Sequence, residues 1–252
     1  MKIAGIIPAR FASTRFPGKP LVEIHGKTMI QRVYEQASKS NLNAVIVATD
    51  DEKIATHVQS FGGNVVLTST AHPTGTDRCK EALDIWSAKH QTQFDAVINI
   101  QGDEPFIHPE QINLLAQAFQ DKNTQLATLI KPLNNKRDLE NPGIIKVSFR
   151  KDLRALYFSR SIIPYPRTSS IEDALKNKSF YKHIGMYGYR ADILAEITKL
   201  QQTPLELLES LEQLRWLENG YEIKLIETNI ETRSVDTPDD LQILLSETKP
   251  ND

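Results

Sequence analysis

The chain has 252 residues, a formal net charge of −2 and a single cysteine, Cys79. The length fits one α/β domain, the acidic balance argues against a nucleic-acid partner, and one cysteine excludes an intramolecular disulfide. The chain has no apolar run near the ~20 residues of a membrane span, and its start lacks the apolar region of a signal peptide. We therefore expect a cytoplasmic protein without an integral membrane segment.

The first half of the chain alternates strand and helix patterns. Short apolar runs predict strands, and apolar residues at helical spacing predict the helices between them. This alternation favours an α/β fold with a mostly parallel sheet flanked by helices. The expected strands are Ile3–Pro8, Ala44–Asp51, Asn64–Thr68 and Asp95–Pro105, and the expected helices are Thr28–Lys39, Thr76–Lys89 and Pro109–Gln120.

The second half is less regular. Strands of mixed direction are predicted in "GIIKVSF", "RALYFSR" and "HIGMYGYR", and a late strand in "YEIKLIETN". The stretches 134–142 and 165–178 are polar and predicted to be loops. Thr203–Asn219 has a capping threonine, a proline and early acids, which predict one continuous helix with solvated Glu206, Glu209 and Glu218. A final helix is expected over Thr237–Ser246.

Three cations follow the first predicted strand: Arg10, Arg15 and Lys19. Guanidinium forks match phosphate oxygens, and an ammonium is a compact point charge. The hydroxyls of Ser13 and Thr14 add neutral donors. Ligands bind beyond the carboxyl ends of parallel strands, so this position favours an anion site held by side chains. The alternative is a solvated surface loop.

Two aspartates also follow predicted strands: Asp103 in "NIQGDEP" and Asp236 in "SVDTPDD". Magnesium usually takes one or two carboxylates together with water and phosphate oxygens, so both are candidate ligands. The alternatives are that Asp103 or Glu104 caps a turn and that Asp236 caps a helix. Sequence spacing alone does not show whether the two aspartates meet.

Eight motifs that span the chain from Ile3 to about Leu245 carry a family resemblance. In order, they are "IIPARFASTRFPGKPL", "VATDD", "TGTDR", "NIQGDEP", "LYFSRSIIP", "HIGMYGYR", "LEQLRWLENG" and "VDTPDDL". Together they resemble the 3-deoxy-manno-octulosonate cytidylyltransferase family, also called CMP-Kdo synthetases. The N-terminal motifs alone would suggest only the wider sugar nucleotidyltransferase superfamily. The motifs "HIGMYGYR" and "LEQLRWLE" narrow the resemblance to this one family.

The resemblance implies an activity and an organisation. Members transfer CMP from CTP to the anomeric hydroxyl of the acidic eight-carbon sugar Kdo, with Mg²⁺, and release pyrophosphate; CMP-Kdo feeds lipopolysaccharide synthesis. The implied fold is Rossmann-like, in a single nucleotidyltransferase domain over residues 1–252 that forms a homodimer. Within it, residues 1–130 would mainly bind nucleotide, 131–225 would mainly bind sugar and dimerise, and 226–252 would return to the core with a metal ligand.

The resemblance also assigns roles, residue by residue. It places the CTP phosphates on Arg10, Arg15 and Lys19, and Mg²⁺ on Asp103 and Asp236. It places cytidine near Thr74, Gly75 and Arg78, and Gln101 at the junction of nucleotide and sugar. The sugar-binding residues it implies are Arg167, His183, Tyr187, Glu212 and Gln213, with Gln101 shared.

Other interpretations of these residues stay open. His183 could be a strand histidine bonded to a backbone carbonyl, Tyr187 and Tyr189 could be strand aromatics on opposite faces, and Arg78 could form a surface pair with Asp77. The true substrate could be 8-amino-Kdo or a sialic acid. A protein of another class, a non-catalytic sugar-nucleotide sensor, would keep the cations but could dispense with the aspartates.

Overall fold

The structure is a computed structural model that describes residues 1–12 and 15–248, so Ser13 and Thr14 lie outside the described residues. The chain forms two compact units. Unit 1 comprises Met1–Ala116 and Glu231–Asp252, and unit 2 comprises Gln117–Ile230. The polypeptide therefore leaves unit 1, builds unit 2 and returns to unit 1. The divisions lie at 116/117 and 230/231, whereas the expected divisions were near residues 130 and 225.

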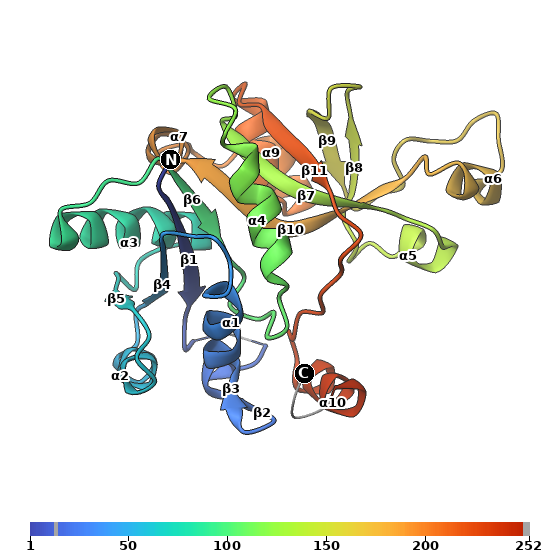
Figure 1. Cartoon of the computed structure of the whole chain (residues 1–252). Coiled ribbons are helices and arrows are strands. Elements are labelled where there is room, and N and C mark those ends of the chain that lie inside the picture. The colour runs from blue at the N-terminus through green and yellow to red at the C-terminus, as the bar shows by residue number, and fades with distance from the viewer. Residues whose placement is uncertain (13–14, 249–252) are drawn as a thin grey trace. The chain divides into compact units, whose positions relative to one another are not determined.

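Unit 1 contains a parallel sheet (Figure 1). Its central strand β1 (Ile3–Ala9) pairs in parallel with β4 (Ala44–Thr49) and with β6 (Ala96–Asn99), and β4 pairs with β5 (Val65–Leu67). All of β1 except Pro8 is buried, as a strand covered on both faces requires. The predicted α/β fold with a mostly parallel sheet is confirmed.

Four helices of unit 1 begin at side-chain caps. Thr28, Asp51, Thr74 and Thr237 each accept a hydrogen bond from a backbone N–H of the first turn. Each helix expected here is found to within two residues. The helices are α1 (Met29–Ala37), α2 (Glu52–Ser60), α3 (Gly75–His90), α4 (Pro109–Ala118) and α10 (Pro238–Glu247), with the short helix η1 (Lys19–Leu21) and the hairpin β2 (Glu23–Ile24) and β3 (Lys27–Thr28).

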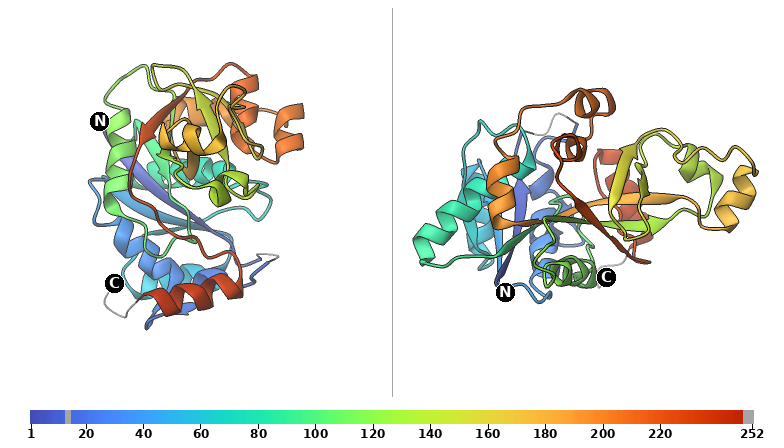
Figure 2. Two further views of the ribbon diagram at one scale, coloured as in Figure 1. Left: turned by 90° about the vertical axis from the view of Figure 1, so that its right-hand side faces the viewer. Right: turned by 90° about the horizontal axis from the view of Figure 1, so that it is seen from above.

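The returning segment packs on the start of the chain. Val235, Leu241 and Leu244 form an apolar cluster with Ile24 and Met29. Figure 2 shows α10 beside the N-terminal elements of this unit. This packing fixes the loop between residues 231 and 237, which carries Asp236.

Unit 2 is built on strands of mixed direction, as predicted. β7 (Leu126–Pro132) pairs antiparallel with β10 (Tyr181–Arg190) and parallel with β11 (Ile223–Glu227). A hairpin of β8 (Lys146–Phe149) and β9 (Ala155–Ser159) joins β10 at Lys182.

Short helices of unit 2 lie where loops were predicted, so those two predictions are wrong. α5 (Lys136–Glu140) and α6 (Ile171–Lys176) are each little more than one turn, too short to show helical periodicity. They form because Leu139 and Leu175 pack in an apolar cluster with Phe180. The sequence also gave no signal for α7 (Ala191–Ile197).

The prediction of one helix over Thr203–Asn219 is wrong. The segment forms α8 (Pro204–Glu209) and α9 (Glu212–Glu218), separated at Ser210, whose φ of 53° is left-handed. The Glu209 carboxylate accepts hydrogen bonds from the Ser159 hydroxyl at 2.6 Å and from the backbone N–H of Arg160 at 2.9 Å. These bonds to the end of β9 hold the chain where the helix breaks.

The acids of this segment are not merely solvated, contrary to expectation. Glu206 is buried and receives a two-pronged contact from Arg215, with Nε 2.7 Å from Oε2. Burial alone would raise the pKa of Glu206, but the hydrogen bonds and charge of Arg215 outweigh it and hold that pKa below its usual value. Glu218 accepts a hydrogen bond from the backbone N–H of Leu205.

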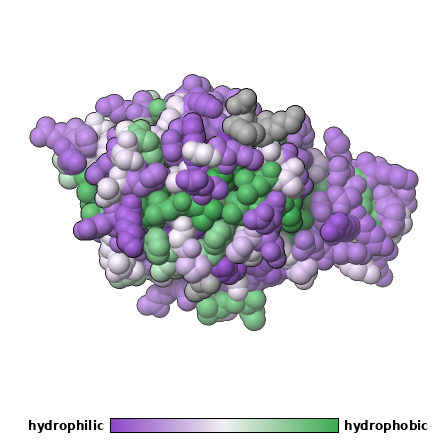
Figure 3. Space-filling model, turned by 90° about the horizontal axis from the view of Figure 1, so that it is seen from below, coloured by the Kyte–Doolittle hydropathy of each residue, from purple (hydrophilic) through white to green (hydrophobic). Residues whose placement is uncertain are grey.

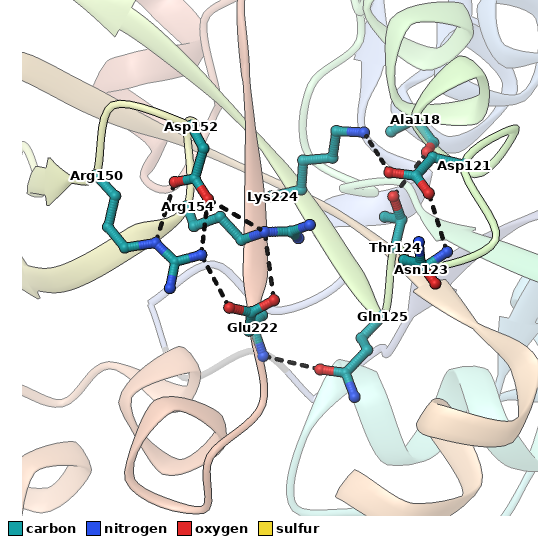
Figure 4. Close-up of polar contacts among 10 residues, drawn as sticks. All are labelled: Ala118, Asp121, Asn123, Thr124, Gln125, Arg150, Asp152, Arg154, Glu222 and Lys224. Carbon is teal, nitrogen blue, oxygen red and sulfur yellow. Dashed lines mark hydrogen bonds and ion pairs between the residues drawn. The ribbon is translucent and has the colours of Figure 1, made fainter.

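Ion pairs attach the β8–β9 hairpin to β11 (Figure 4). Arg150 contacts Asp152 at 2.8 Å and Glu222 at 2.9 Å, and Arg154 contacts Glu222 at 3.3 Å. Each pair is at least partly exposed and contributes little alone, but together they hold the turn of the hairpin against the start of β11.

The face drawn in Figure 3 is mostly hydrophilic. Hydrophobic residues gather there in a central strip and in a smaller patch at the lower edge. Among residues 1–12 and 15–248, the helices are all too short or too polar to cross a bilayer.

Candidate active site

A cleft of about 250 Å³ opens in unit 1 where β1 and β6 end and α3 begins. Gly102, which follows β6, lies so close to β1 that an added Cβ would be 2.7 Å from the carbonyl oxygen of Pro8. Glycine therefore lets the two strand ends approach each other. Every residue that the resemblance assigned to CTP or metal lines this cleft: Arg10, Arg15, Lys19, Thr74, Gly75, Arg78, Gln101, Asp103 and Asp236.

The two aspartates meet at Lys19. The Lys19 ammonium donates to Asp103 Oδ2 at 2.8 Å and to Asp236 Oδ1 at 3.4 Å, and Arg15 reaches Asp236 Oδ1 at 3.0 Å. The side chain that caps α10 is Thr237, assisted by Asp240, so the interpretation of Asp236 as the helix cap is wrong. Glu104, which follows Asp103 in the sequence, has a buried side chain, and burial raises the pKa of its carboxyl to about 7.

The donor set of this acid pair fits magnesium. Among the described residues, no three His, Cys, Asp or Glu side chains gather to form a closed metal cage. Two carboxylates at the mouth of a cationic cleft leave coordination positions for water and phosphate oxygens, which is how Mg²⁺ is commonly bound. Asp103 and Asp236 could therefore hold Mg²⁺ together with a nucleotide.

Arg78 supports the wall of the cleft. Its buried guanidinium donates to the Thr68 hydroxyl at 2.6 Å and to Asp50 Oδ2 at 2.8 Å. Asp77 accepts instead from the Thr74 hydroxyl at 2.7 Å, so the alternative of an exposed Arg78–Asp77 pair is wrong. His72, to which we assigned no role, also lines the cleft and contacts Glu81.

His183, in unit 2, is held as a neutral ring. Its Nε2 lies 2.9 Å from the Thr128 hydroxyl, which also lies 2.8 Å from the carbonyl oxygen of Met186. The hydroxyl has one proton, which goes to the carbonyl, so His183 Nε2 is the donor and Nδ1 is an acceptor. Burial lowers the pKa of His183 to about 3. The ring bonds a hydroxyl rather than a backbone carbonyl, contrary to the alternative considered from the sequence.

Two other predicted sugar residues carry buried polar atoms. Tyr187 Oη and Gln213 Nε2 have no hydrogen-bond partner among the described residues, although the residues are only 9% and 4% exposed. Buried polar groups are nearly always paired, so both atoms are available for a hydrogen bond to a ligand. Tyr187 and Tyr189 lie on the same face of β10, and their stacked rings are 6.2 Å apart. Residues two apart on a strand share a face, so the interpretation that these tyrosines lie on opposite faces is wrong.

The last two predicted sugar residues differ in setting. Glu212 is the first residue of α9 and is partly buried, next in sequence to Gln213. Arg167 is exposed on the loop before α6. No sequence pattern singled out Arg160, whose guanidinium donates to the carbonyl oxygens of Glu209 and Pro142 and so fixes the end of α8.

Comparison with known proteins identifies the family. The Cytidylyltransferase family model matches residues 4–226. The 3-deoxy-manno-octulosonate cytidylyltransferase of Parabacteroides distasonis is 56% identical over 250 residues, which cover 98% of each chain. The chain belongs to this family. The corresponding enzyme of Fusobacterium nucleatum is 49% identical over 252 residues and covers all of this chain and 98% of its own.

Solved structures agree with this membership of the cytidylyltransferase family. A CMP:2-keto-3-deoxy-manno-octonic acid synthetase complexed with CTP is 39% identical, with a TM-score of 0.88 and 98% of each chain covered. A 4-diphosphocytidyl-2C-methyl-D-erythritol synthase from Anaerococcus prevotii, 14% identical with a TM-score of 0.65, shares the fold alone. The recognition made from the eight motifs is confirmed.

The cleft of this cytidylyltransferase family member can neutralise a polyphosphate. Arg10 and Arg15 on the loop after β1 and Lys19 at the start of η1 supply three positive charges, and the start of α3 presents backbone N–H groups. A helix N-terminus with nearby cations is a favourable site for anions. The arrangement therefore suits a nucleoside triphosphate.

Proposed function

We propose that this chain transfers CMP from CTP to the anomeric hydroxyl of Kdo, giving CMP-Kdo and pyrophosphate for lipopolysaccharide synthesis. The observation that carries the proposal is that three cations and two aspartates converge in one cleft. The chain that forms this cleft is 56% identical to a curated 3-deoxy-manno-octulosonate cytidylyltransferase. Residues 1–130 would mainly serve the nucleotide and 131–225 the sugar.

The reaction is a direct, in-line displacement at the α-phosphorus of CTP, in which the enzyme acts by positioning and by charge stabilisation. Arg10 binds the α-phosphate. Arg15 and Lys19 neutralise the charge that develops on the leaving pyrophosphate. Thr74 and Gly75, at the start of α3, contact cytidine, and Arg78 holds that wall in place through Asp50.

Asp103 and Asp236 hold Mg²⁺ in this proposal. The bound ion supplies Lewis-acid stabilisation of phosphate charge and lowers the pKa of the attacking hydroxyl. The two carboxylates fix the position of the ion. Both of them contact the Lys19 ammonium, so both can contact a single cation.

The sugar is bound by polar groups of unit 2. Gln213 Nε2 donates to a sugar oxygen, and Tyr187 Oη supplies a second donor or acceptor. His183 accepts a sugar hydroxyl at Nδ1 while Thr128 holds the other ring nitrogen. A neutral His183 contributes no charge, so the sugar carboxylate needs a cation, which we assign to Arg167. Glu212 accepts from sugar hydroxyls, and Gln101 contacts both substrates.

Pyrophosphate release tests the substrate. The purified protein, CTP and Mg²⁺ are incubated with Kdo, 8-amino-Kdo or N-acetylneuraminic acid, and pyrophosphate is measured. We expect the highest kcat/KM with Kdo and negligible release when Mg²⁺ is chelated. Preference for another sugar would reassign the substrate. CTP binding without pyrophosphate release from any sugar would favour a sensor.

Removal of the Gln213 amide should weaken sugar binding selectively. We expect Gln213→Ala to raise the KM for Kdo by at least about tenfold, because a site built to pair a sugar hydroxyl loses that pairing. The KM for CTP should change little. Gln201→Ala, an exposed glutamine of the same unit, is the matched control. A selective rise in the KM for CTP would mean that Gln213 faces the nucleotide.

We also infer a cytoplasmic homodimer. Unit 2 leaves the adjacent Leu207 and Leu208 exposed to 60% and 82%, and contiguous exposed apolar side chains mark interaction surfaces. Light scattering at assay concentrations measures the mass in solution, and a monomer there would contradict the inference.

A further inference from the structure

The acid pair of the cleft already has a counter-ion within the chain. The Lys19 ammonium lies 2.8 Å from Asp103 Oδ2 and 3.4 Å from Asp236 Oδ1, and its side chain is only 13% exposed. It therefore contacts both carboxylates that the proposed function assigns to Mg²⁺. A divalent cation and this ammonium compete for the same oxygens.

Neighbouring residues fix the backbone of Lys19, whereas its side chain is long and flexible. Lys19 begins η1 after Gly18, whose φ of 72° turns the chain, and the Gly18 N–H donates to the carbonyl oxygen of Phe11. From this anchored position, a flexible four-carbon stem carries the ammonium. Arg15 is a weaker competitor, because among the described residues it pairs only with Asp236 and its side chain is 66% exposed.

We propose that Lys19 is an exchangeable counter-ion that keeps Mg²⁺ off Asp103 and Asp236 until a nucleoside triphosphate draws the ammonium to its phosphates. The inference rests on the proposed function of the acid pair. Before the nucleotide arrives, the Lys19 ammonium occupies oxygens of both carboxylates and the divalent cation binds weakly. Once the ammonium turns to phosphate, the carboxylates and the phosphate oxygens together form the metal site.

This exchange predicts thermodynamic coupling. If CTP raises the affinity for metal by releasing the carboxylates, metal must raise the affinity for CTP by the same factor. Part of that coupling comes from direct contact between metal and phosphate, and the part that comes from Lys19 disappears when the ammonium is removed. The affinity for metal without nucleotide is therefore the decisive quantity.

The experiment measures Mn²⁺ binding to the whole chain by electron paramagnetic resonance of free Mn²⁺, without CTP. We expect Lys19→Met to tighten Mn²⁺ binding by about fivefold or more, since an ion pair of this burial opposes the metal by roughly that factor. Lys19→Arg keeps the charge and should bind Mn²⁺ weakly, as the unchanged protein does. Lys27→Met, which removes a lysine paired with Glu35 in the same unit, is the matched control and should change nothing.

Unchanged or weaker Mn²⁺ binding by Lys19→Met, with a circular dichroism spectrum like that of the unchanged protein, would overturn the exchange. A separate measurement tests the assignment beneath it. In the ternary complex with CTP, Asp103→Asn should weaken Mn²⁺ binding. If it does not, the metal role of the acid pair fails; if it does while Lys19→Met has no effect without CTP, only the exchange fails.

Discussion

Asp103→Asn should lower kcat by at least about a hundredfold while leaving the fold intact, because replacing a carboxylate ligand by an amide loses several kcal/mol of transition-state stabilisation. The backbone contact that Asp103 makes, accepting from the Val235 N–H, does not involve the side chain, so the loop should keep its place. Steady-state pyrophosphate release, with a thermal melt of each protein, measures both effects.

The control for this change is Asp84→Asn. Asp84 is an exposed acid of the same unit that is paired with Lys80 on α3, so the variant alters net charge equally without touching the cleft. Near-normal kcat in Asp103→Asn would remove the metal role from this residue. A large loss of thermal stability would point to a structural role instead.

Arg215→Met should lower the free energy of unfolding of unit 2 by about 3–5 kcal/mol, because it leaves the Glu206 carboxylate buried without its partner. Both side chains are 7% exposed, and Arg215 also donates to the carbonyl oxygen of Leu200. Urea denaturation followed by tryptophan fluorescence reports the loss, since Trp216 is buried in the same unit.

Two further variants separate charge burial from lost packing. Arg190→Met breaks the exposed pair with Asp192 and should cost less than about 1 kcal/mol. Adding Glu206→Gln to Arg215→Met should recover part of the loss, because no charge then remains buried. A loss for Arg215→Met no larger than for Arg190→Met would contradict the buried ion pair.

The sequence predicted those helices and strands that are specified by residues within or next to them. The caps Thr28 and Thr74 and the apolar run of β1 lie at or within the elements they specify, and the four helices predicted in unit 1 are found to within two residues. The strand predicted over Asp95–Pro105 is too long, because β6 ends at Asn99. The break between α8 and α9 was missed because its cause is distant. The partners of Glu209 lie 49 and 50 residues away in sequence, and no helical pattern reveals them.

The same distinction holds for the candidate site. Motif order supplied the residues of the cleft, and residue chemistry supplied the phosphate and magnesium hypotheses. Sequence spacing could not show that Lys19 bridges Asp103 and Asp236, which lie 84 and 217 residues from it. Nor could it show that Thr128 fixes the tautomer of His183, because register between β7 and β10 creates that contact.

The two-segment construction of unit 1 has a consequence for biosynthesis. The ribosome completes β1 to α4 and then all of unit 2 before it adds Asp236. The synthesis of unit 2 takes on the order of ten seconds at ordinary elongation rates. During that time the nascent chain has Lys19 and Asp103 but not the second acid, and Ile24 and Met29 lack the cover of α10. The second carboxylate of the proposed metal site therefore joins the chain only in the last stretch of translation.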